Sequence, residues 1–336
     1  MAKRRHSREE IHRYISARLK ESVTPQKMRA QELALKKFGL LPAGFELENF
    51  MVKLLTEQAT AYYDPHRKEF FVADWTPLDL LRPAIVHELT HALQDQQVGL
   101  KDFLLKEELN QDEQTARSAV VEGGGVLAMM EYMLSATGMK KELLAKMGEL
   151  VASATAAELK KFPVFSEAPL YLREGLLFPY TAGMQYMSRL VEKQGKSAYR
   201  AALKNPPRST AEVLHPGRAA PQPSGDLRPP EVSPLPSGYA LLDSDVLGEF
   251  DVRILLKQHA GEETAQKVAS AWRGLRYALY ENQSRTSAFL AHRSRWEDAA
   301  AASAFAEAYR KVLAARGEKN ARVEVKGDTV SIIETP

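Results

Sequence analysis

Two histidines stand four residues apart in this chain, at His87 and His91, and Glu88 directly follows the first of them. Residues four apart on an α-helix project only about 40° from each other, so both imidazoles can reach one ion. Glu88 is offset by one residue, which places its carboxylate beside such an ion, where it can take a proton from a metal-activated water. The spacing therefore predicts a helix that holds a divalent metal.

Four apolar residues lie on the face of this helix opposite the histidines: Ile85, Leu89, Ala92 and Leu93. An apolar stripe of this kind indicates a helix packed on a core. We therefore expect the stripe to be buried. His87, Glu88, His91 and Asp95 would then face a cleft. The alternative is a surface helix with two solvated histidines, because short motifs also arise by chance.

A catalytic zinc usually has three protein ligands and one position open to water. The chain contains no cysteine, so the third ligand must be a histidine or a carboxylate. A metzincin would have a histidine where this chain has Gln97, which excludes that class. Glu122 is the best candidate because it is the acidic residue of an otherwise apolar stretch, 119–125. Glu131, nine residues further on and on the opposite helical face, is a weaker candidate.

Three glycines follow Glu122 directly, at positions 123–125. Within a helix they cost about 2 to 3 kcal/mol relative to alanine, so another interaction should offset this loss. Close approach to the histidine helix would do so, because glycine lacks the side chain that holds two backbones apart. This approach would also bring Glu122 to the metal. The alternative is that Glu122 only caps or ends a helix.

The chain is expected to be α+β and mostly helical. A β-hairpin is predicted just before the histidine helix, with strands at 56–63 and 69–73 and a turn at 64–67. Helices are predicted at 6–38, 47–55, about 78 or 83 to 97, 110–136, 140–160 and 180–204. Residues 1–205 would thus contain the whole metal site.

Nine of the 18 prolines lie between positions 206 and 236, which excludes a regular helix or central strand there. The segment 206–238 is either a linker or an ordered surface loop, and we favour a loop of the same domain. Residues 239–336 are expected to form an α+β portion packed on the catalytic core. Its predicted elements are apolar segments at 245–260, a helix at 262–272, strands at 276–282 and 287–294, a helix at 297–316 and a hairpin at 322–333.

Charge and hydropathy exclude several classes of partner. The 46 Lys and Arg nearly balance the 43 Asp and Glu, which leaves too weak a field to hold nucleic acid. A membrane-spanning helix would need an apolar run of about 18 residues, and the sequence contains no such run. Residues 1–6 are basic, but the apolar stretch of a signal peptide does not follow them. A trimmed secreted or periplasmic protein would look the same, so the compartment and the oligomeric state stay open.

The chain resembles the gluzincins, zinc metallopeptidases with H-E-x-x-H on one helix and a ligand glutamate on the next. It is also similar to a little-characterised bacterial group of predicted peptidases. The similar segments are 62–65, 86–96, 121–123, 206–210, 214–216, 247–250 and 271–274, so the likeness spans about residues 45 to 310. The resemblance implies a zincin-like core surrounded by a helical bundle, with zinc on His87, His91 and Glu122 and with Glu88 as general base.

The chain departs from gluzincins of the thermolysin type at Val126, where those enzymes have an aspartate that orients a zinc histidine. We expect Asp95, one turn beyond His91, to take this role. A histidine or tyrosine from elsewhere in the fold commonly stabilises the negative charge of the intermediate. His215 and Tyr180 are the two candidates, although His215 beside a proline is also typical of a plain loop residue.

These features predict a zinc-dependent metallopeptidase that hydrolyses peptide bonds, with a peptide or protein as substrate. The hairpin would offer an edge strand to an extended substrate. Two alternatives use the same residues. One is a catalytically inactive, zinc-binding, peptidase-like protein that acts as an interaction scaffold, and the other is a hydrolase of non-peptide amides or esters.

Overall fold

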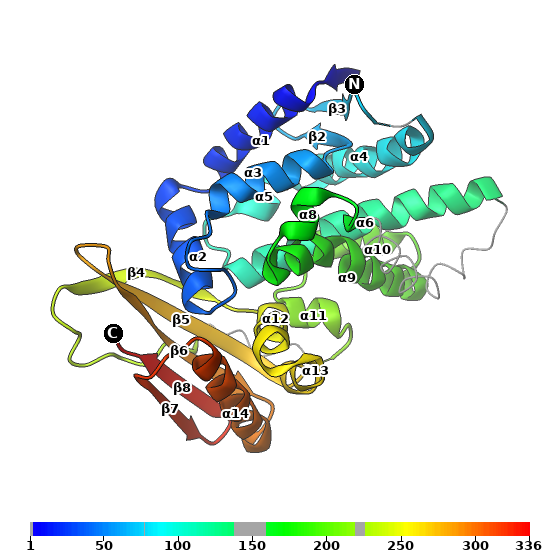
Figure 1. The fold of residues 1–336 in the computed structure, drawn as a ribbon. Coiled ribbons are helices and arrows are strands. Elements are labelled where there is room, and N and C mark those ends of the chain that lie inside the picture. Colours follow the sequence, from blue (N-terminus) through cyan, green and yellow to red (C-terminus); the bar gives the residue numbers. More distant parts are fainter. Residues whose placement is uncertain (1–2, 77, 138–158, 219–225) are drawn as a thin grey trace.

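The computed structural model describes residues 3–76, 78–137, 159–218 and 226–336. The chain is α+β and mostly helical, as the sequence predicts. A three-stranded sheet lies at the N-terminal end and a five-stranded sheet at the C-terminal end, with a layer of helices between them (Figure 1). The helix predicted at 140–160 falls mainly outside the described residues.

The predicted hairpin is present as β2 (Ala61–Asp64) and β3 (Glu69–Ala73). Its first strand begins later than predicted, because α3 (Leu47–Gln58) extends into the first residues of the predicted strand 56–63. A strand that was not predicted, β1 (Lys3–His6), pairs in parallel with β3. The strand order is β1-β3-β2, so among the described strands β2 pairs with β3 alone.

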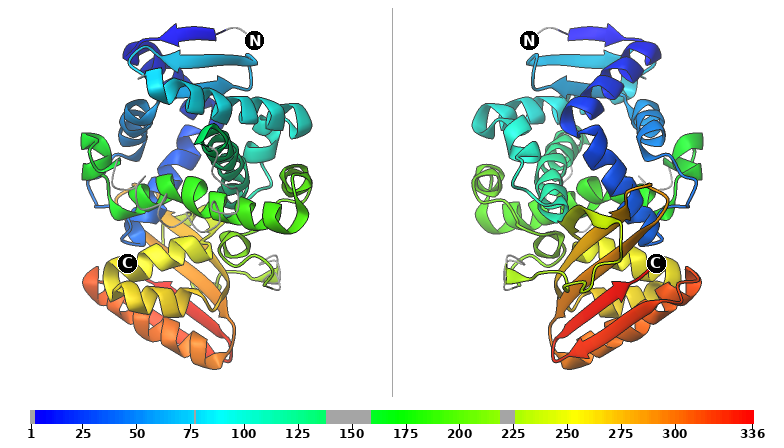
Figure 2. Two further views of the ribbon diagram at one scale, coloured as in Figure 1. Left: turned by 90° about the vertical axis from the view of Figure 1, so that its right-hand side faces the viewer. Right: turned by 90° about the vertical axis from the view of Figure 1, so that its left-hand side faces the viewer.

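The helical layer is built on α6 (Gln111–Thr137), which packs against both α4 (Leu78–Val98) and α9 (Leu170–Gln194). Both views of Figure 2 show this layer between the two sheets. The segment predicted as one helix at 180–204 belongs to α9 and α10 (Ser197–Lys204), which are separated by Gly195 with a φ of 64°. Shorter or peripheral helices complete this part: α1 (Arg8–Ser22), α2 (Pro25–Lys37), α5 (Leu100–Leu105) and α8 (Pro163–Glu167).

The prediction that α4 buries its apolar stripe is right for Ala92, which is 6% exposed, and wrong for Leu89 and Leu93. Leu89 and Leu93 are 44% and 58% exposed, whereas Glu88, His91 and Asp95 are buried. The hairpin and α6 pack against the polar side of α4, and these neighbours supply hydrogen-bond partners for the buried groups. The apolar pattern therefore did not predict the polar side chains that α4 buries.

The C-terminal part is a five-stranded antiparallel sheet of order β4-β5-β6-β8-β7. The helix α14 packs on β6, β8 and β7 (Figure 2). Buried aromatic rings of Trp296 and Phe305 stack on each other there. The predicted helix 262–272 ends earlier, since Trp272 begins β5. The elements are β4 (Tyr239–Val246), α12 (Glu249–Ala260), α13 (Glu262–Ala269), β5 (Trp272–Asn282), β6 (Ala288–Trp296), α14 (Ala299–Ala315), β7 (Ala321–Lys326) and β8 (Thr329–Glu334).

The described residues of the proline-rich segment are ordered against the rest of the fold. They include a short helix, α11 (Thr210–Leu214), capped by Ser209. Thr210 links the segment to both flanking parts, because it donates to Asp112 of α6 and accepts from the backbone N–H of Phe250 in α12. These contacts are those of a surface loop rather than of a free linker.

Asp112 is a buried carboxyl group at the start of α6, only 2% exposed. The backbone N–H and the hydroxyl of Thr210 donate to its Oδ1 over 2.9 and 2.6 Å. Burial raises the pKa of Asp112 to about 7, with the nearby Asp251 and Glu113 adding to the rise and the Thr210 hydrogen bonds opposing it. The folded protein therefore favours the protonated form of this side chain.

This shift predicts a pH-dependent stability difference between the wild type and Asp112→Asn. An aspartate in an unfolded chain has a pKa of about 3.9, so between that value and 7 the folded wild type binds more protons than the unfolded chain. Its free energy of unfolding should fall across this window and level off above pH 7. The asparagine variant lacks this titration and should gain stability relative to the wild type from pH 4.5 to pH 7.5, measured by urea denaturation. A difference that does not change with pH would contradict the prediction.

Candidate metal centre

The structure brings His87, His91 and Glu122 together where α4 crosses α6. His87 Nε2 lies 3.0 Å from His91 Nε2 and 3.1 Å from Glu122 Oε2. His91 Nε2 lies 3.4 Å from the same carboxylate oxygen. Three donor atoms from two helices thus form a nearly equilateral triangle.

This triangle fits a zinc ion. Ligands at about 2.0 to 2.1 Å in tetrahedral geometry are separated from one another by about 3.3 Å, close to the three separations observed. Two imidazoles and one carboxylate are also a common donor set of catalytic zinc. His87, His91 and Glu122 would therefore hold the metal and leave a fourth position for water or substrate.

Glu88 is a second carboxylate within reach of the histidines, since its ligand atom and theirs all lie within 4.8 Å of one another. Its Oε2, however, accepts a hydrogen bond of 2.7 Å from the backbone N–H of Tyr63 on β2. Burial raises the pKa of Glu88, and the two histidines oppose this rise. The contacts of Glu122 with both imidazoles make it the better candidate for a third ligand, and Glu88 lies beside the three donor atoms.

All three glycines of α6 face close neighbours, and two of them, Gly124 and Gly125, face α4 as the sequence predicts. A Cβ on Gly125 would lie 2.7 Å from the His87 ring, and one on Gly124 would lie 2.9 Å from Gln94 Nε2. Gly123 instead faces α9, where a Cβ would lie 2.1 Å from the carbonyl carbon of Gly183. Gly124 and Gly125 thus leave room for side chains of α4. Gly123 permits a close approach of α6 to α9, which was not predicted.

The Glu122 carboxylate and the His91 imidazole shift each other's pKa. Burial would raise the pKa of Glu122, but His91 and His87 hold it well below its usual range. Burial would lower the pKa of His91, but the Glu122 carboxylate raises it above its usual value. A proton on His91 therefore supplies positive charge that a bound divalent cation would replace.

The expectation that Asp95 orients His91 is wrong. Asp95 accepts hydrogen bonds from Lys68 Nζ at 2.7 Å and from the Tyr63 hydroxyl at 2.9 Å, so the hairpin engages its carboxylate. His91 Nδ1 lies instead 2.9 Å from Oε1 of Gln94. Residues three and four positions on are both neighbours on a helix, so contacts with other elements decide between them. The hairpin engages Asp95, and the Val121 carbonyl of α6 accepts from Gln94.

Of the two candidates for stabilising negative charge, the structure brings Tyr180 to the site and not His215. The Tyr180 ring stacks beside His87 with centroids 6.2 Å apart. The charge of Glu122 and then burial raise the Tyr180 pKa well above its usual value, so the hydroxyl keeps its proton. His215 follows α11, and its Nε2 lies 2.7 Å from Glu249 Oε1 on α12, on the side of the helical layer away from α4 (Figure 1).

A mainly apolar cavity of about 500 Å³ opens beside His87, Glu88 and Tyr180. Thr60 and Ala61 border it at the start of β2. Much of its apolar wall comes from α6 and α9, and Leu159 adds to it. The residues are Val126, Met129, Met130, Met133, Leu159, Leu176, Leu177 and Met184. The cavity therefore offers room for a large apolar group next to the candidate metal ligands.

A family model described as a domain of unknown function (DUF8575) matches residues 239–336. This match covers the C-terminal part and does not include α4 or α6. Searches among curated proteins and among solved structures found no match. The function is therefore inferred from the geometry of the site.

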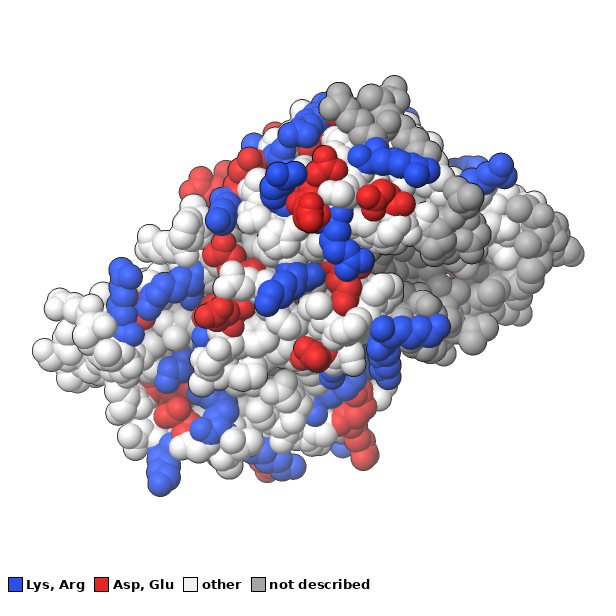
Figure 3. Space-filling view, turned by 45° about the horizontal axis from the view of Figure 1, so that its top comes forward, with Lys and Arg blue, Asp and Glu red and all other residues white. Residues whose placement is uncertain are grey.

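The described surface adds two observations about partners. Every helix in the described part of the chain is too short or too polar to cross a membrane. On the face drawn in Figure 3, basic and acidic side chains are interspersed over the described residues. This face therefore presents charges of both signs to a partner.

Proposed function

We propose that the protein is a zinc-dependent metallopeptidase. The observation that carries this proposal is the convergence of His87, His91 and Glu122 within 3.0 to 3.4 Å of one another. The buried Glu88 stands next to them, and an apolar cavity opens at the same place. This combination supports hydrolysis more strongly than a closed structural zinc site, which would use four protein ligands.

Glu88 is assigned the role of general base. The Tyr63 N–H engages Oε2, which fixes the carboxylate and leaves Oε1 to accept the proton of a water molecule. Burial of the carboxyl favours its protonated form, so Glu88 can hold this proton and deliver it to the leaving amine. When bound, zinc supplies a Lewis acid that polarises a carbonyl and acidifies water.

Tyr180 is assigned the role of hydrogen-bond donor to the oxygen that becomes negative. Its hydroxyl lies near Glu122 and Glu88, and its raised pKa keeps the phenol protonated at neutral pH. A fixed donor in a partly buried site stabilises developing charge more strongly than solvent does.

The outer edge of β2, on the side away from β3, supports a peptide as substrate. Alternate residues of a strand point their backbone groups the same way, so the N–H of Ala61 shares the outward direction of the Tyr63 N–H. Ala61 borders the cavity. An extended peptide paired with β2 would place a side chain in the apolar cavity, and we expect a large apolar residue beside the scissile bond.

The proposal is tested by metal content and turnover together. We expect the wild type to hold one zinc per chain and to lose peptide hydrolysis on chelation, with recovery on zinc addition. Glu122→Gln should weaken zinc binding by more than the roughly 10- to 100-fold typical for loss of an outer hydrogen-bond partner, because a ligand itself is changed. Zinc competition with a chelator measures this effect.

Glu131→Gln on the same helix is the matched control and should bind zinc as the wild type does. Equal zinc affinity of Glu122→Gln and the wild type would overturn the ligand assignment. A wild type that binds zinc without hydrolysing any peptide in a denatured protein mixture would overturn the peptidase and favour a zinc-binding scaffold.

A further inference from the structure

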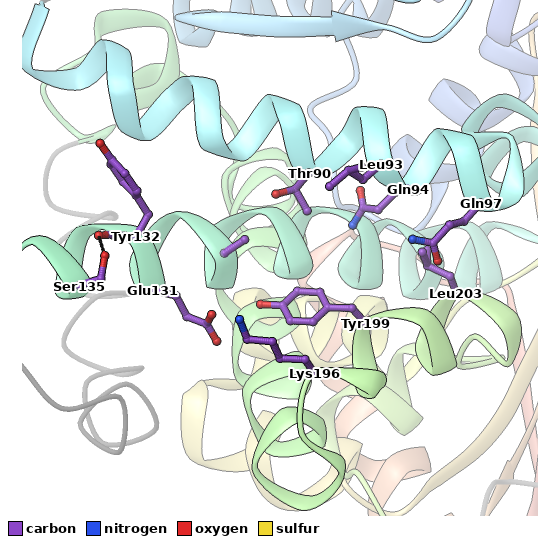
Figure 4. Close-up of a pocket in the computed structure, with 11 residues that line it drawn as sticks. Thr90, Leu93, Gln94, Gln97, Glu131, Tyr132, Ser135, Lys196, Tyr199 and Leu203 are labelled. Carbon is purple, nitrogen blue, oxygen red and sulfur yellow. Dashed lines mark hydrogen bonds between the residues drawn. The ribbon is translucent and has the colours of Figure 1, made fainter.

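Gln94 is a buried amide between the two helices that carry the metal ligands. Only 5% of it is exposed, and Figure 4 shows its side chain pointing from α4 toward α6. Its Nε2 donates to the backbone carbonyl of Val121 over 3.0 Å, and its Oε1 lies 2.9 Å from His91 Nδ1. One side chain thus touches a metal ligand on α4 and the residue just before Glu122 on α6.

These two contacts fix the direction of the amide. A backbone carbonyl can only accept a hydrogen bond, so the amide nitrogen must face Val121. The amide oxygen must then face His91, and Nδ1 of that imidazole must carry the donated proton. In the neutral imidazole, the form that binds a metal, the Nε2 lone pair is then directed to the side where His87 and Glu122 lie.

We propose that Gln94 is a positioning residue that fixes the tautomer of His91 and sets the spacing of α4 and α6 at Glu122. This inference rests on the proposed zinc site. Gly124 makes room for the amide, because a Cβ there would lie 2.9 Å from Gln94 Nε2. A carboxylate at position 94 could accept from His91, but it could not donate to the Val121 carbonyl, so only an amide serves both helices.

The test compares Gln94→Met, which keeps the length of the side chain and loses both hydrogen bonds, with Gln94→Glu, which keeps the acceptor. We expect Gln94→Met to lower zinc affinity about 10- to 100-fold, as loss of an outer partner of a ligand does. Gln94→Glu should lie closer to the wild type. Gln97→Met is the matched control, since Gln97 is exposed one turn further along and borders the same hollow as Gln94 (Figure 4).

A second readout is independent of the metal. The Nδ1 proton of His91 should exchange slowly with solvent, as seen by NMR, in both metal-free and zinc-loaded wild type, and rapidly in Gln94→Met. A wild type that binds no zinc but keeps this protected proton would refute the zinc site and leave the hydrogen bond standing. Unchanged zinc affinity and unchanged proton exchange in Gln94→Met, with zinc bound by the wild type, would overturn the role of Gln94.

Discussion

Glu88→Gln is expected to lower peptide turnover by about 100- to 10,000-fold, the usual contribution of a general base, while zinc remains bound. Glutamine has nearly the same shape, and its amide oxygen can still accept the Tyr63 N–H that now engages Glu88 at 2.7 Å. The amide cannot take up a proton at neutral pH. The substitution therefore removes the proton acceptor without removing a metal ligand or a hydrogen bond of the fold.

The measurement is single-turnover hydrolysis of a peptide by zinc-loaded protein, with zinc content determined on the same sample. Glu131→Gln serves as a control for the loss of one negative charge near the crossing of α4 and α6. If Glu88→Gln hydrolysed peptide at the wild-type rate with zinc bound, Glu88 would not be the base. If zinc were lost together with turnover, Glu88 would belong to the ligand set.

The position of Glu122 could be predicted from the sequence because two independent signals coincide there. It is the acidic residue of an apolar segment, and three glycines follow it. Glycines within a helix indicate close contacts, and Gly124 and Gly125 face side chains of α4 as this argument requires. The convergence of Glu122 with His87 and His91 follows from that contact.

The partner of His91 could not be predicted, because the choice depends on a different part of the chain. Gln94 and Asp95 both lie next to His91 on the helix surface. Lys68 and Tyr63 of the hairpin engage Asp95, and the Val121 carbonyl engages Gln94. Periodicity within one helix contains no information about these neighbours.

The burial of α4 was wrongly predicted for a related physical reason. Apolar periodicity assumes that a helix buries its apolar stripe, whereas α4 buries polar side chains that bond to one another and to neighbours. Leu89 and Leu93 remain exposed as a result. The strand β1 was missed because its pairing with β3 joins residues almost 70 positions apart, for example Lys3 with Phe70. The local hairpin β2–β3, which needs only a turn, was predicted and is present.

Gly183→Ala is expected to destabilise the fold by about 3 kcal/mol or more, while Gly175→Ala on the same helix stabilises it. A Cβ on Gly183 would lie 2.2 Å from the backbone oxygen of Ala119 in α6, and backbone cannot rotate away as a side chain can. Overpacking of this kind costs about 1 to 3 kcal/mol where neighbours can yield, and here α6 and α9 must separate. Gly175 has no atom within 4 Å of its added Cβ, so alanine there gains about 0.5 to 1 kcal/mol of helix propensity.

Urea denaturation of the two variants measures this contrast, and zinc affinity shows its consequence for the site. Separation of the helices at Gly183 also shifts α6 at Gly123, whose own Cβ position is occupied by Gly183 backbone. Glu122 directly precedes that residue, so Gly183→Ala should weaken zinc binding even where the protein remains folded. Similar stability of the two variants would show that α6 and α9 do not touch through their backbones. The third ligand would then depend on the contact between α4 and α6 alone.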